Sequence, residues 1–86
     1  MILNMFQPRS LSQLLPGQTA TIGAIDAEDQ IRERMAALGL RQGRLISVIR
    51  RARMNGPIQI RIGTTDLMIR RVEAAKVHLL QTATAS

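Results

Sequence analysis

The clearest pattern along the chain is the strict alternation of apolar and polar residues from Pro57 to Ile62. Its three isoleucines share one side of the segment, which is typical of a strand with one buried face. Shorter runs rich in β-branched residues, each bounded by turn-forming residues, predict further strands. The strands expected from these patterns cover residues 19–25, 45–49, 57–62, 66–70 and 77–80.

A helical period interrupts the strand patterns after the first strand. Ile31, Met35 and Leu38 place one apolar stripe along a helix. Asp26 is the expected N-cap, and Gly39 stands where a left-handed residue is needed to end the helix after Leu38. This segment is the main helix of the prediction.

Two shorter helical turns complete the pattern. Ser10 followed by Gln13 is the capping-box spacing, which predicts a turn over residues 11–15, and residues 72–75 fit another. Five short strands with one helix inserted after the first predict a mainly β fold, a small barrel. We expect one domain over residues 10–80, a flexible leader over 1–9 and a disordered tail over 81–86.

Composition narrows the classes of site available to an 86-residue chain. Because the sequence has no cysteine, it excludes disulfides, thiolate metal sites and cysteine nucleophiles, and the cytoplasm is the default location. The apolar start of the chain is far shorter than a membrane span, so we expect no membrane insertion. Phe6 is the only aromatic residue, which leaves an aliphatic core.

Charge is the second compositional signal, at +6 with an uneven distribution. Four of the six acidic residues fall between Asp26 and Glu33, whereas the stretch from Arg41 to Arg71 holds eight arginines against Asp66 alone. Such a basic face suits an anionic partner. The arginines expected to form this face, or the rim of a partner site, are Arg50, Arg51, Arg53, Arg61, Arg70 and Arg71.

A series of short motifs resembles the FeoA family over residues 11–80. The motifs are Leu-Leu-Pro-Gly at 14–17, Arg-Met-Ala-Ala-Leu-Gly-Leu at 34–40, Gly43 before a strand, Gly-Pro-Ile at 56–58 and Leu-Met-Ile-Arg-Arg-Val-Glu-Ala at 67–74. The resemblance implies a five-stranded SH3-like barrel. It also implies an accessory role in bacterial ferrous iron uptake, with a FeoB-type membrane GTPase as the partner and a position at the inner membrane through that partner.

Candidate chemistry is sparse. His78 is the only histidine and is expected to be a surface or hydrogen-bonded side chain, and the acidic cluster is explained by helix capping, so we predict no metal site. Neither a nucleophile beside a base nor a phosphate-binding glycine motif is present. We therefore predict no cofactor and no enzymatic activity, and we assign any GTP chemistry to the partner.

The helix stripe is the first candidate for partner binding. It comprises Ile31, Met35, Leu38 and Leu40, with Met35 as the leading contact residue because methionine suits adaptable apolar contacts. The alternative interpretation of the same stripe is that it packs the helix onto the barrel.

Two alternatives to the docking hypothesis remain open. The arginines could contact nucleic-acid phosphates, although the chain lacks the stacking aromatics that single-strand binders use, so no specific nucleic acid is expected. An open strand edge could also pair with a second copy, which makes a homo-oligomer possible.

Overall fold

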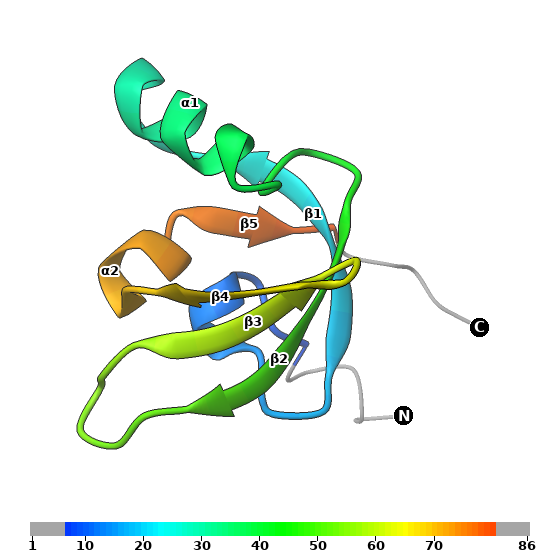
Figure 1. The fold of residues 1–86 in the computed structure, drawn as a ribbon, viewed down its shortest axis with the longest axis vertical. Helices are drawn as coiled ribbons and strands as arrows, with labels where there is room; N and C mark the ends of the chain where they lie inside the picture. Colours follow the sequence, from blue (N-terminus) through cyan, green and yellow to red (C-terminus); the bar gives the residue numbers. More distant parts are fainter. Residues whose placement is uncertain (1–6, 81–86) are drawn as a thin grey trace.

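The structure, a computed structural model, describes residues 7–80 and contains the predicted elements in the predicted order (Figure 1). In chain order they are the 3-10 helix η2 (Leu11–Gln13), β1 (Thr19–Ile25), α1 (Asp29–Ala37), β2 (Leu45–Arg51), β3 (Ile58–Ile62), β4 (Thr65–Ile69), α2 (Arg71–Ala74) and β5 (Val77–Leu79). Residues 1–6 and 81–86, most of the predicted leader and all of the predicted tail, lie outside the described residues.

The five strands form one antiparallel sheet in the order β4-β3-β2-β1-β5. β1 joins its two halves, because residues 19–21 pair with β2 and residues 22–25 pair with β5. The register of β1 shifts at Gly23, where an added Cβ would lie 3.2 Å from the backbone nitrogen of Leu80. Figure 1 shows β1 as a long curved strand, and this curvature lets one sheet enclose a core.

The core is aliphatic and follows the alternation of the strands. Ile58, Ile60 and Ile62 of β3 are all buried, as the sequence pattern predicts. Leu11 of η2, Leu14 and residues of every strand close the same cluster. The mainly β fold with one inserted helix is therefore confirmed.

The C-terminal end of α1 forms as predicted. Gly39 has a φ of +102°, the backbone N–H of Leu40 donates to the carbonyl of Met35 at 2.9 Å, and Gly39 donates to Ala36 at 3.0 Å. This pair of bonds is a Schellman motif, which satisfies carbonyls at the helix end.

The predicted N-terminal end of α1 is wrong. The helix begins at Asp29 with Glu28 at the N-cap position, and no side chain caps it. Asp26 instead lies at the end of β1, where its backbone N–H donates to the carbonyl of Lys76 at 2.8 Å. Pairing of β1 with β5 therefore extends the chain past the residue that would otherwise start a helix.

The capping box predicted at the N-terminal turn does not form either, and the turn is shorter than expected. The Ser10 hydroxyl contacts the Ser12 hydroxyl at 2.7 Å, and the Gln13 side chain accepts from the backbone N–H of Arg9 at 2.8 Å. Ser10 forms a β-bridge with His78, and Arg9 accepts a backbone hydrogen bond from Leu79. The segment before η2 thus covers the outer edge of β5.

Candidate docking surfaces

The predicted apolar stripe on α1 is divided between the core and the surface. Met35 and Leu40 are each only 2% exposed, whereas Leu38 is 50% exposed and Ile31 is half-buried. Met35 anchors the helix, and the Schellman turn folds Leu40 inward. The leading contact residue of the sequence prediction is therefore a core residue, which leaves Leu38, with Ile31 at its margin, as the accessible part of the stripe.

Polar contacts fix α1 at one end of the molecule (Figure 1). Arg34 of α1 forms an ion pair with Glu73 of α2, and the Arg41 guanidinium donates to the carbonyl of Ala36 at 3.2 Å. Arg32 pairs with Asp29 within the helix. The Arg34–Glu73 pair thus joins α1 to α2, while the other two contacts stabilise the helix and its C-terminal end.

The six arginines of the predicted basic face do not act alike. Arg51 is partly buried and donates from Nη1 to the carbonyls of Ser12 and Leu14, each at 2.8 Å. Its guanidinium group thus connects the end of β2 to the η2 segment, and it provides hydrogen-bond donors for two carbonyls outside the strands. Arg51 is a structural residue.

Arg61 is engaged as well, on the outer face of the sheet. It lies opposite Asp66 in the register of β3 and β4, with Nε 2.6 Å from Oδ1 and Nη2 3.1 Å from Oδ2. Gln59 adds a third contact to the same carboxylate at 3.3 Å. The hydrogen bond from Arg61 holds the pKa of Asp66 below its ordinary value, and the same contact raises the pKa of Arg61.

The other arginines of the predicted face form no ion pair with the described residues. Arg50, Arg53 and Arg70 are exposed, and Arg71 is half-buried at the start of α2. Two of the six guanidinium groups are therefore used within the fold, and the other four remain candidates for a basic contact surface.

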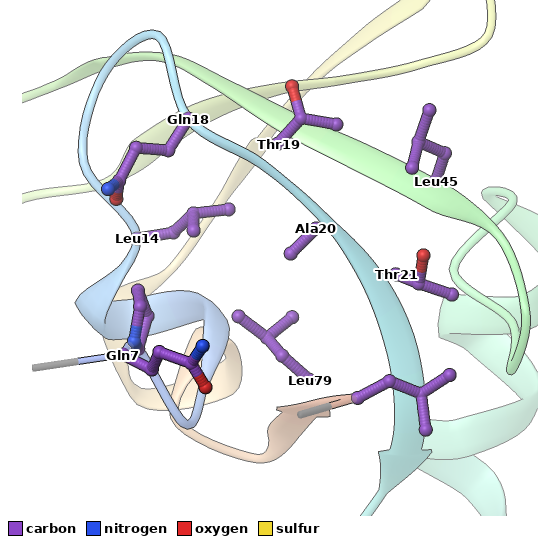
Figure 2. Close-up of a pocket in the computed structure, with 10 residues that line it drawn as sticks. Gln7, Leu14, Gln18, Thr19, Ala20, Thr21, Leu45 and Leu79 are labelled. Atoms are coloured by element: carbon purple, nitrogen blue, oxygen red, sulfur yellow. The ribbon is translucent and has the colours of Figure 1, made fainter. Parts of the chain in front are cut away.

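Two hollows that the sequence prediction missed open beside β1. The first, the apolar hollow, has a volume of about 370 Å³ and is lined by Gln7, Pro8, Leu14, Gln18, Thr19, Ala20, Thr21, Leu45, Leu79 and Leu80. Figure 2 shows Leu14, Ala20 and Leu79 turned toward the same space from three segments.

The second, the basic hollow, has a volume of about 340 Å³ and is lined by Thr19, Arg44, Leu45, Ile46, Ser47, Arg61 and Gly63. Both hollows depend on where β1 leaves β5, which local patterns do not reveal.

Titratable groups are otherwise scattered over the surface. His78 is exposed, and its Nε2 lies 4.0 Å from the carboxylate of Asp26. Within residues 7–80, no three histidine, aspartate or glutamate side chains gather where they could hold a metal ion. No helix in that same part of the chain has the length and apolar content to cross a membrane.

Comparison with known proteins identifies the family. The FeoA domain model matches residues 9–79. The FeoA protein of Chlorobium tepidum is 34% identical, with a TM-score of 0.74, over 84% of this chain and 70% of that one. An iron uptake regulatory protein, FeoA, is 28% identical, with a TM-score of 0.74, over 80% of this chain and 91% of that one.

A third structure bears on the fold alone. The zinc-complexed FeoA of Stenotrophomonas maltophilia, an SH3 domain protein, is 24% identical with a TM-score of 0.72, over 84% of this chain and 89% of that one. The SH3-like architecture is thereby confirmed. A search of curated proteins found no match. The match over residues 9–79 nevertheless shows that the chain belongs to the FeoA domain family, which is associated with ferrous iron transport.

Proposed function

We propose that the chain is a non-enzymatic accessory module of ferrous iron uptake, which binds the cytoplasmic part of a FeoB-type GTPase transporter. The observation that carries the proposal is the FeoA domain match over residues 9–79. The S. maltophilia relative is described as a candidate activating factor of bacterial ferrous iron transport, and another relative as an iron uptake regulatory protein. An accessory role of this kind requires a docking surface rather than a catalytic site.

The exposed side chains of the chain support a role in binding another protein. The ion pairs Arg32–Asp29, Arg34–Glu73 and Arg61–Asp66 join surface side chains and organise the fold. Large apolar side chains are also exposed, and among them Leu38, at the end of α1, is 50% exposed on the helix that carries the half-buried Ile31. An apolar side chain presented by a helix is one of the ways in which a protein surface anchors a partner.

The docking surface that we propose is the exposed part of the α1 stripe. Leu38 is the contact residue and Ile31 lies at its margin, while Met35 and Leu40 support the surface from the core. Of the exposed arginines, Arg70 lies next to α2, which the Arg34–Glu73 pair joins to α1, and its positive charge favours an acidic partner surface. In this arrangement the module acts at the cytoplasmic face of the membrane through its partner.

A pull-down from membrane extract tests both the partner and the surface. Tagged wild type, Leu38→Asp and the control Met54→Asp are compared, and the retained proteins are identified. Met54 is 96% exposed at a hairpin tip, so its substitution adds the same charge without touching α1. We expect a FeoB-type GTPase with wild type and Met54→Asp, and at least about tenfold less of it with Leu38→Asp, the loss of an interface anchor.

Two results would contradict the proposal in different ways. Retention of the transporter by all three proteins would remove Leu38 from the interface and leave the partner in place. Retention of nucleic acid, with no transporter, would favour the arginine surface as the functional one. Circular dichroism of each variant shows that the substitutions leave the fold intact.

A further inference from the structure

The apolar and basic hollows adjoin each other at β1 and β2. Thr19 and Leu45 line both of them. In the register of these strands Thr19 lies opposite Ser47, and Thr21 lies opposite Leu45, so strand pairing fixes the shared wall. The two hollows are thus neighbours with a shared wall, and we call them together the β1–β2 groove.

One half of the groove is shaped for an aliphatic side chain. Leu14, Ala20 and Leu79 face the space from different segments (Figure 2), while Leu45 and Leu80 are 61% and 54% exposed at its margin. Its volume of about 370 Å³ falls within the range of roughly 300 to 1,000 Å³ that is usual for binding pockets. An apolar surface of this size, open to solvent, is a candidate contact site.

The other half carries unbalanced positive charge. The Arg44 guanidinium forms no ion pair or hydrogen bond with any described residue, and its Nη2 lies 3.6 Å from the position that a Cβ on Gly63 would take. Arg61 directs Nε and Nη2 toward Asp66, which leaves Nη1 without either of those contacts. Arg61 is thus paired with Asp66, whereas Arg44 has no described partner for its charge, and the hydroxyls of Thr19 and Ser47 add donors beside them.

We propose that the β1–β2 groove binds an extended, acidic segment of a protein partner, with an aliphatic side chain in the apolar half and a carboxylate in the basic half. The register places Thr19 beside Ser47 and Ser47 beside Arg61, a span of two strand spacings, or about 10 Å. An extended chain covers that distance in about three residues. The preferred ligand therefore has its acidic residue about three positions from its aliphatic residue.

A peptide titration tests the groove without the transporter. The probe is acetyl-Asp-Ser-Ser-Leu-Ser-Ser-Asp-amide, which offers the carboxylate on either side of the leucine and so fits either chain direction. It is added to the isotopically labelled full chain at low ionic strength, and amide shifts are followed by NMR. We expect saturable shifts of Thr19, Thr21, Leu45 and Ser47, with a dissociation constant in the millimolar range or tighter.

Matched peptides and variants assign each half of the groove. Replacing both aspartates of the probe by asparagine, or its leucine by serine, should weaken binding about tenfold. Arg44→Glu should do the same to the original probe. Lys76→Glu makes an equal charge change at the opposite end of β5 and should alter the affinity less than about twofold.

Four results would overturn the proposal. The first is the absence of saturable shifts with the wild-type chain, and the second is equal affinity for the aspartate and asparagine probes. The third is an equal loss with Arg44→Glu and Lys76→Glu, which would reduce the effect to net charge. The fourth is binding of inorganic phosphate to the same amides as tightly as the peptide, which would leave the apolar half without a role.

Discussion

Arg50 and Arg51 are neighbours in β2 with opposite surroundings. Arg50 is exposed and lies across from Gln59, whereas Arg51 turns toward the η2 segment and binds two carbonyls. Successive side chains of a strand point to opposite faces, which gives the two neighbouring arginines different surroundings. At the scale of single residues, the surroundings of each guanidinium decide whether its charge belongs to the fold or to the surface.

Replacing Arg51 tests its structural role. Arg51→Met keeps the aliphatic stem but removes both donors, which leaves the carbonyls of Ser12 and Leu14 without this partner. Hydrogen bonds from charged groups are worth about 1.5–3 kcal/mol, so we expect about 2–3 kcal/mol of destabilisation in urea unfolding. Arg50→Met, the matched control, should change the free energy of unfolding by less than about 0.5 kcal/mol. Equal effects of the two substitutions would contradict the assignment.

The Arg61–Asp66 contact predicts a pH dependence. Because Arg61 lowers the pKa of Asp66 in the folded state, the contact stabilises the fold at pH values above the ordinary pKa of an aspartate. This contribution is lost as the pH falls from that value through the lowered pKa. An NMR titration of the Asp66 carboxyl should give a pKa below its ordinary value in the wild type and a higher one in Arg61→Gln. An unchanged pKa in the variant would show that Arg61 does not set it.

At the scale of elements, the hairpin between β2 and β3 departs from its sequence signal. Asn-Gly at 55–56 is the usual signal of a tight hairpin, but the two left-handed residues are Met54 and Asn55, with φ values of 58° and 62°. The turn closes with the N–H of Gly56 donating to the carbonyl of Arg53 at 3.1 Å. Glycine is required next to the turn, because a Cβ on Gly56 would lie 2.8 Å from that of Ala52.

A substitution at Met54 tests whether the left-handed residues of the turn are 54–55 rather than 55–56. Met54→Gly removes the cost of a left-handed methionine, about 1–2 kcal/mol. Part of this gain is cancelled because glycine makes the unfolded chain more flexible. We expect a net stabilisation of about 0.5 kcal/mol or more, measured by urea unfolding. If Met54 had an ordinary φ, the same change would destabilise the protein, and that result would contradict the turn described here.

Much of the fold was predictable because local signals and tertiary structure agree. The alternation from Ile58 to Ile62 gives the inward face of β3, and Gly39 gives the end of α1. Where local signals and tertiary structure disagree, hydrogen bonds to distant segments determine the conformation. Asp26 donates a backbone hydrogen bond to Lys76, just before β5, and the capping serine and glutamine near η2 make other contacts. Such choices depend on partners distant in the sequence.

The candidate surfaces were predictable only in part for the same reason. The helical period correctly grouped Met35 and Leu38, but it could not say which of them the sheet covers. The number of arginines predicted a positively charged surface, whereas the inward turn of Arg51 depends on the position of Leu14. The two hollows result from the division of β1 between β2 and β5, which no local pattern encodes.

At the scale of the molecule, the proposed contact surfaces are carried by different parts of a small domain. Leu38 lies at the end of α1, and the β1–β2 groove lies beside β1 and β2. Both are held by interactions described above: the Schellman motif and the Arg34–Glu73 pair for α1, and strand pairing for the groove. Surfaces fixed in this way lose little conformational freedom on binding, which favours affinity.

The central claim is that the chain binds a FeoB-type transporter through its α1 surface. The most direct test measures the affinity of the purified chain for the purified cytoplasmic GTPase part of that transporter by biolayer interferometry. We predict saturable binding, weakened at least about tenfold by Leu38→Asp and less than about twofold by Met54→Asp. The absence of saturable binding by the folded wild type, or equal effects of the two substitutions, would contradict the account.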